Sequence, residues 1–189
     1  ANPVGLKLTP YNTVGVVSTQ SKFSGYSAYF DGVSAYLTAP DIFSQLGARD
    51  FTAEVFVRLS TLGASQAIFL NRSARSALGG LLSWEVANGF SFYTGDIYTA
   101  SWEVILHSGL SGIAVNTWYH VAITRSSGVY TLWVDGVSRA SVSWGGTPGG
   151  FSATIYIGVA EDSTSYLNGY LNDFRVTAGV ARYPAAFTP

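Results

Sequence analysis

The chain has 189 residues, of which 48% are hydrophobic and 11% are charged, and its formal net charge is −1. The ten Lys and Arg residues are scattered singly, so no basic stripe offers a nucleic-acid surface. No apolar run approaches the roughly 18 residues that a membrane-spanning helix needs, and the absence of cysteine excludes disulfides and thiolate zinc sites. Many aromatic and β-branched residues, with few Lys, Glu and Gln, predict one all-β domain over residues 1–189.

Strands are predicted along the whole chain, separated by turn signals. In chain order they are the runs on either side of Asp31-Gly32 and the ranges 51–59, 81–87, 90–94, 102–107, 118–125, 129–134, 138–143, 153–158 and 170–177. Asp31-Gly32, Asn88-Gly89 and Asp135-Gly136 each lie between two such runs, a pattern typical of hairpins with type I′ turns. Short strands at this spacing predict an antiparallel two-sheet sandwich.

Four stretches carry a resemblance to a known family over roughly residues 18–189. They are "STQSKFSGYSAYFDGVSAYLTAP", "DFTAEVFVRL", "NTWYHVAITRSSGVYTLWVDGV" and "IYIGVAEDSTSYLNGYLNDFRVTAGVARYPAAFTP". In this order they resemble the laminin-G-like, concanavalin A-like jelly roll, in the form found in bacteriophage and cyanophage structural proteins. The resemblance implies an all-β, two-sheet antiparallel jelly-roll sandwich of the concanavalin A-like lectin/glucanase fold.

The same resemblance implies a function and a location. It points to a non-enzymatic component of the phage virion surface, a capsid decoration or tail-associated domain that is adhesive or stabilising. Its partners would be virion proteins and glycans, without nucleic acid or membrane insertion, and it would form a homo-oligomer, with a trimer as one option. The alternative is a calcium-dependent carbohydrate-binding lectin module outside a virion, which would be extracellular.

The two ends of the chain are unusual. Residues 1–17 are shorter than the first strand region of the phage-type proteins, so the first strand is expected at 4–8 or 13–17, or from a neighbouring subunit. Residues 178–189 are predicted to form an extended C-terminal strap, because Pro184 fixes its own φ and keeps Tyr183 extended. Tyr183 and Phe187 would anchor this strap over an edge or one end of the sandwich, where a proline-bearing segment blocks unwanted strand pairing.

Aromatic side chains near loops are candidates for carbohydrate binding, because stacking on a ring removes the C–H face of a sugar from water. Trp144, in the Gly-rich stretch "SWGGTPGG", is the first candidate. Trp102, Tyr98 and Tyr93 follow, in or beside "YTGDIYTASW". The alternative is that these rings pack inside the sandwich or against another subunit.

Calcium is the ion that the sequence could accommodate, although no cofactor is required. The stretch "EDSTSYLNG" offers Glu161, Asp162 and Asn168 as oxygen ligands. An ordinary solvated loop has the same composition, and this alternative is favoured.

Catalysis is not predicted. Glycosidases of this fold place paired carboxylates on one strand in an E-x-D-x-x-E pattern, which the chain lacks, and Glu54, Glu85 and Glu103 each stand alone in their strands. His107 and His120 are the two histidines, and His120 is interpreted as a structural strand residue. The sequence therefore predicts a protein that binds and does not catalyse.

Overall fold

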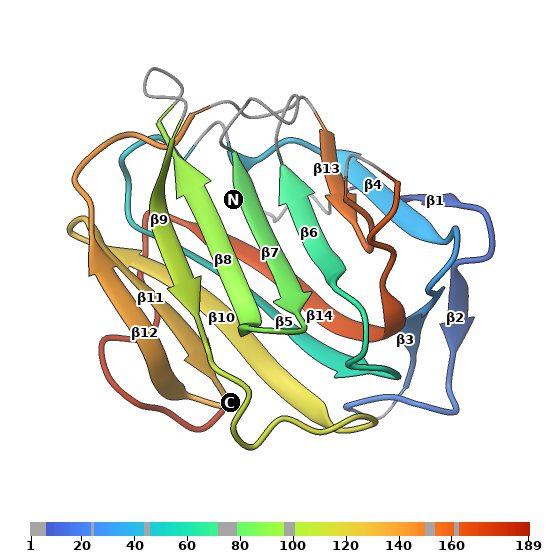
Figure 1. Ribbon diagram of the computed structural model, residues 1–189. Coiled ribbons are helices and arrows are strands. Elements are labelled where there is room, and N and C mark those ends of the chain that lie inside the picture. The colour runs from blue at the N-terminus through green and yellow to red at the C-terminus, as the bar shows by residue number, and fades with distance from the viewer. Residues whose placement is uncertain are drawn as a thin grey trace.

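The computed structural model describes residues 7–23, 25–43, 46–71, 79–96, 101–149, 154–160 and 163–189. Within these ranges the chain forms two antiparallel sheets that pack face to face (Figure 1). The described residues include no helix long and apolar enough to cross a bilayer. The predicted all-β, two-sheet antiparallel sandwich is confirmed.

We call the sheet nearer the viewer in Figure 1 the front sheet and the other the back sheet. The front sheet has the order β1 (Thr9–Tyr11), β4 (Tyr36–Pro40), β13 (Thr154–Ile157), β6 (Gln66–Asn71), β7 (Gly80–Glu85), β8 (Gly89–Gly95) and β9 (Trp102–His107). The back sheet has the order β12 (Val137–Ser143), β11 (Val129–Val134), β10 (Trp118–Ser126), β5 (Phe51–Leu59), β14 (Asn168–Ala178), β3 (Ser27–Asp31) and β2 (Gly15–Val17).

The core fills the space between the two sheets. On β5, Ala53, Val55 and Val57 face inward and have no exposed surface, as the period-two pattern predicts. Opposite them the front sheet contributes large side chains such as Trp84 and Phe92, each 2% exposed. Full burial of one large apolar side chain contributes about 1.5–3 kcal/mol, so this layer holds the sandwich together without disulfides.

Two of the three predicted hairpins are confirmed. Asp135-Gly136 joins β11 to β12, and φ angles of 50° and 75° at these residues match the left-handed geometry of a type I′ turn. A hairpin also joins β7 to β8, but Glu85 pairs with Gly89, so the loop is residues 86–88, and Asn88 lacks the positive φ that the predicted type I′ turn requires.

The hairpin predicted at Asp31-Gly32 is wrong, because β3 belongs to the back sheet and β4 to the front sheet. The segment between them crosses from one sheet to the other. The Asp31 carboxylate directs this crossing by accepting hydrogen bonds from the amides of Ser34 and Ala35, both at 2.9 Å, and of Val33. Although burial disfavours its charged form, these bonds hold the pKa of Asp31 well below its usual range.

Two short or featureless strands, β6 and β1, escaped prediction. Every residue of β6 is buried, so the run "QAIFLN" shows no alternation of polar and apolar residues. At the N-terminus, β1 pairs with β4 and β2 pairs with β3 of the same chain. The strand expected at 13–17 is thus present as β2, whereas part of the alternative at 4–8 lies outside the described residues.

Candidate functional site

The outer face of the front sheet brings two of the predicted sugar-binding rings together. Tyr93 lies on β8 and Trp102 at the start of β9, and their ring centroids are 5.4 Å apart. A bulge in β9, opposite Thr94 and Gly95, is what allows Trp102 to reach the ring of Tyr93. Both rings are partly exposed, so they offer a surface to a ligand.

Polar side chains surround this ring pair. The Tyr93 hydroxyl donates to Glu85 Oε1 at 2.7 Å, and Asn88 Nδ2 donates to Glu85 Oε2 at 2.8 Å. Burial and the bond to Glu85 raise the pKa of Tyr93, so its hydroxyl stays protonated at neutral pH. A carboxylate held by two donors is oriented and stays available to further donors.

A serine and histidine pair lies beside the rings. Ser91 Oγ is 2.9 Å from His107 Nδ1, and the His107 ring lies 5.7 Å from that of Tyr93. Ser83, opposite Ser91 on β7, has a buried hydroxyl with no hydrogen-bond partner among the described atoms. We define the front-face cluster as Ser83, Glu85, Ser91, Tyr93, Trp102 and His107.

The other predicted sugar-binding residues are placed differently. Trp144 follows β12 and packs partly buried against the core, with its ring 6.0 Å from that of Tyr130. A Cβ atom on Gly146 would lie 2.4 Å from the Trp144 ring, so this glycine packs closely on the indole. Trp144 is therefore packed between neighbouring residues and is not part of the front-face cluster. Tyr98 lies outside the described residues.

The predicted calcium ligands are only partly described. Glu161 and Asp162 lie outside the described residues. Asn168 begins β14, where its amide donates to Gln66 Oε1 at 2.7 Å and its carbonyl accepts from Ser60 N at 2.9 Å. Across the described ranges, no group of three or more His, Cys, Asp or Glu residues could hold a metal ion. Calcium binding stays a prediction.

The densest group of charges lies on the outer face of the back sheet, around Glu54 of β5. Glu54 Oε2 is 3.1 Å from His120 Nε2, and Oε1 is 3.2 Å from Arg175 Nε and 3.6 Å from Arg182 Nε. The Tyr183 hydroxyl donates to Oε2 as well. Burial opposes ionisation of Glu54, but these partners outweigh it and lower the pKa of the carboxyl.

The C-terminal strap seals this charged group. Beyond β14, the strap crosses the outer face of β5, β10 and β11, where the Tyr183 and Phe187 rings stack at 3.5 Å. Phe187 also lies 5.6 Å from the ring of His120 and 5.8 Å from that of Trp133, and its amide donates to the Gly136 carbonyl at 3.1 Å. The predicted anchors are confirmed, but the strap covers a face of the sandwich and not an edge or an end.

A bulge in β14 positions Arg175 beside Glu54. Asn172 pairs with Phe56 and Arg175 with Glu54, so β14 carries one extra residue in this interval. Asp173 has a φ of 51° and binds Arg175 Nη2 at 2.9 Å. Because one extra residue reverses the alternation, Phe174 packs against the core and Arg175 reaches the outer face. A regular strand pattern could not reveal this reversal.

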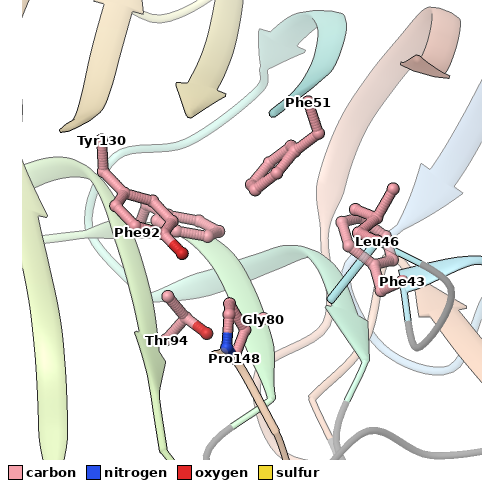
Figure 2. Close-up of a pocket in the computed structure, with 8 residues that line it drawn as sticks. All are labelled: Phe43, Leu46, Phe51, Gly80, Phe92, Thr94, Tyr130 and Pro148. Atoms are coloured by element: carbon pink, nitrogen blue, oxygen red, sulfur yellow. The ribbon is translucent and has the colours of Figure 1, made fainter. Parts of the chain in front are cut away.

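The cavities inside the sandwich do not match a carbohydrate site. Figure 2 shows one where side chains such as Phe92 and Tyr130 converge from both sheets; its volume is about 10 Å³, room for about one water molecule. A hollow of about 610 Å³ lies between the sheets beside β3, with mainly apolar walls such as Phe30, Leu37 and Leu171. A sugar there would leave most of its hydroxyl groups unpaired.

Comparisons with solved structures find the same fold. The binding domain of Paraclostridial Mosquitocidal Protein 1 superposes with a TM-score of 0.72 at 16% identity, over 97% of this chain and 45% of that chain. The botulinum neurotoxin serotype D ligand binding domain in complex with N-acetylneuraminic acid gives a TM-score of 0.70 at 12% identity, over 93% and 43%. This chain thus spans less than half the length of those toxin chains.

A third similar structure is nearer in size. Domain 4 of AbnA, a GH43 extracellular arabinanase from Geobacillus stearothermophilus, in complex with arabinotriose, gives a TM-score of 0.66 at 15% identity, over 91% of this chain and 82% of that chain. At these identities the likeness establishes the fold alone. No match to the chain was found among curated proteins.

The sequence itself matches a family model over residues 31–181, most of the chain. That model describes the laminin-G-type concanavalin A-like lectin/glucanases superfamily. The match includes every strand from β4 to β14, and so strands of both sheets. This protein is a member of the concanavalin A-like lectin/glucanase superfamily.

Proposed function

We propose that this protein is a non-enzymatic glycan-binding domain whose ligand lies on the outer face of the front sheet. The observation that carries the proposal is the ring pair of Tyr93 and Trp102, 5.4 Å apart, beside oriented polar groups. Rings cover the C–H face of a sugar, while the partly exposed carboxylate of Glu85 can accept hydrogen bonds from its hydroxyl groups. The ligand complexes of two structurally similar proteins, with N-acetylneuraminic acid and with arabinotriose, support a glycan as ligand.

The placement of carboxylates supports binding without hydrolysis. The two carboxylates compared are those of Glu85 and Glu103. Glu85 pairs with Gly89 of β8, whereas Trp102, the neighbour of Glu103, pairs with Gly95, six residues further along β8. The backbones of Glu85 and Glu103 are therefore about 20 Å apart, whereas glycosidases hold their two carboxyl groups about 5–9.5 Å apart. Glu54 is buried beneath the strap, with 2% of its surface exposed.

The setting we propose is the surface of a phage virion, on a capsid or tail. It is supported by the sequence stretches "QSKFSGYSAYFDG" and "DFRVTAGVARYPAAFTP", which resemble phage structural proteins. A lectin module outside a virion is the second candidate, and calcium dependence would favour it. Recovery of the protein with purified particles distinguishes the two settings.

Glycan-array screening followed by calorimetry tests the glycan proposal. We expect Trp102→Ala to weaken binding roughly tenfold or more, because an aromatic contact contributes about 0.5–1.5 kcal/mol beyond the area it buries. Tyr26→Ala is the matched control, since Tyr26 is 66% exposed but lies beside β3, away from the cluster. Trp144→Ala tests, in the same assay, whether the ring first predicted to bind a sugar takes part in binding.

Three results would decide the question. Absence of binding to any glycan, or equal loss with Tyr26→Ala and Trp102→Ala, contradicts the proposed site. Loss with Trp144→Ala alone moves the site to the loop that follows β12. Loss of binding after addition of a chelator favours the calcium-dependent lectin.

A further inference from the structure

We infer that the outer face of the back sheet, at the end away from the strap, docks a short acidic segment of a partner protein through Arg58. Such a contact leaves the glycan site on the opposite sheet free, and the inference does not depend on that site. It starts from the strand register, which aligns one outward side chain from each of β3, β14, β5 and β10, four neighbouring strands of the back layer (Figure 1). In this order the row is Tyr29, Tyr170, Arg58 and Trp118.

The row faces away from the core. Its members alternate along their strands with core residues such as Val57 and Leu171, so their side chains lie on the outer face. All four side chains are partly exposed. The strap is held further along the same face, because Arg58 and Glu54 are four residues apart on β5. Arg58 therefore lies about 13 Å along the strand from the carboxylate to which Tyr183 donates.

Arg58 is a cation without an anion. Its guanidinium carbon lies 5.4 Å from the centre of the Tyr170 ring, a contact that orients the group but does not neutralise its charge. In the part of the chain that the structure describes, Arg58 has no hydrogen bond or ion pair, whereas Arg175 and Arg182 both bind Glu54. The five N–H donors of its guanidinium are thus left for a ligand.

A second cation lies beside the row. Lys22 Nζ is 5.3 Å from the centre of the Phe56 ring, and Phe23, which is 51% exposed, packs edge-on against the same ring at 5.0 Å. Lys22 also has no ion pair with any described residue. Two unpaired cations among exposed rings are complementary to a ligand that carries carboxylates and apolar groups. We define the back-face patch as Lys22, Phe23, Tyr29, Arg58, Trp118 and Tyr170.

The composition of the patch favours a protein as the partner. Tyr, Trp and Arg are the residues most enriched at the energetic centres of protein interfaces. The planar guanidinium of Arg58 matches a carboxylate in a bidentate pair, which a flexible lysine does not. A bilayer surface is a poorer match, because recruitment to anionic lipids relies on clusters of several basic residues and the patch has two.

The size of the patch indicates a segment and not a large globular surface. The row from Tyr29 to Trp118 crosses three strand spacings, about 14 Å, and Phe56 lies about 7 Å from Arg58 along β5. This area is far below the roughly 800 Å² that each partner buries in a standard interface. A loop or a terminal peptide with one or two acidic side chains would cover it.

Selection of a displayed library of random short peptides on the immobilised full chain tests the inference, followed by calorimetry with the enriched peptides. We expect these peptides to carry Asp or Glu beside aromatic or aliphatic residues. Arg58→Gln should weaken their binding by roughly tenfold or more, because it removes a charge-assisted hydrogen bond. Arg58→Lys should restore part of the affinity, since it returns the charge without the planar fork. Arg139→Gln is the matched control, because Arg139 is exposed on β12 of the same sheet.

Lys22→Gln repeats the test at an exposed position with little risk to folding, and a smaller loss of affinity is expected. Failure to enrich any peptide, enrichment of peptides without acidic residues, or equal losses with Arg58→Gln and Arg139→Gln overturns the inference. Tighter binding to heparin or to phosphatidylglycerol vesicles than to any acidic peptide, if lost with Arg58→Gln, also overturns it, because the patch would then belong to an acidic glycan or a membrane. None of these results changes the glycan proposal, which Trp102→Ala tests on the other sheet.

Discussion

The two outer faces of the sandwich differ in what covers them. On the back sheet, the strap lies over Glu54, whose side chain is 1% exposed although it carries a charge. On the front sheet, Tyr93, Trp102 and Ile105 meet solvent directly, and Ile105 is 47% exposed. Clusters of ionisable groups with shifted pKa values are often functional, yet here the charged cluster around Glu54 is covered by the C-terminal strap. Exposure, more than charge, therefore distinguishes the proposed glycan-binding face from the part of the opposite face that the strap covers.

The largest expected effect is the loss of the buried carboxylate. Glu54→Ala should lower the free energy of unfolding by about 3–5 kcal/mol, the cost of breaking a buried ion pair from one side. His120 would lose the partner of its Nε2 atom, and the Tyr183 hydroxyl would lose its acceptor. Urea denaturation followed by tryptophan fluorescence measures the change.

Glu54→Gln is the matched variant for this test. The amide keeps an acceptor for Tyr183 but removes the charge that faces Arg175 and Arg182. We expect a smaller loss than with Glu54→Ala. Equal stability of the wild type and both variants would show that the strap is held without the carboxylate.

Acidification of the wild-type protein should reproduce part of the stability loss expected for Glu54→Ala. The pKa of Glu54 is lowered from 4.5 in the folded state, so the unfolded chain takes up the proton first as the pH falls. The stabilisation by Glu54 is therefore complete above about pH 4.5 and is lost as the pH falls through the lower folded pKa. Unfolding measured from pH 7 to pH 3 should show a smaller decline in Glu54→Gln, because Asp31, which also has a lowered pKa, contributes equally to both proteins.

The strap also shows which features of the fold could be predicted from the sequence alone. Pro184, Tyr183 and Phe187 identified an extended, anchored segment, because proline restricts local backbone geometry directly. The face that it covers could not be predicted, since that depends on Glu54 and His120, which are 66 residues apart in the chain. Likewise, Tyr93 and Trp102 were each recognised as candidates, but their contact depends on a bulge in β9 that leaves no local signal.

A backbone contact gives the next largest effect. Gly136 has a φ of 75°, and a Cβ atom there would lie 1.7 Å from the Phe187 carbonyl oxygen. Gly136→Ala should therefore push the strap away and cost roughly 1–3 kcal/mol or more, combining strain with the lost contact. Gly112→Ala is the control, because Gly112 has a φ of 78° with nothing within 4 Å of the added atom. If both variants lose the same stability, the strap does not press on this turn.

The smallest expected effect is on the front face. Ile105→Ala should change the free energy of unfolding by no more than about 0.5 kcal/mol, because a half-exposed side chain away from the core contributes little. Ile157→Ala, on β13 and 2% exposed in the core, should cost about 2–5 kcal/mol in the same assay. A loss above about 2 kcal/mol with Ile105→Ala would mean that the front face is also covered, as the back face is by the strap. The difference between the faces would then disappear, and with it the reason for placing the glycan on β7 to β9.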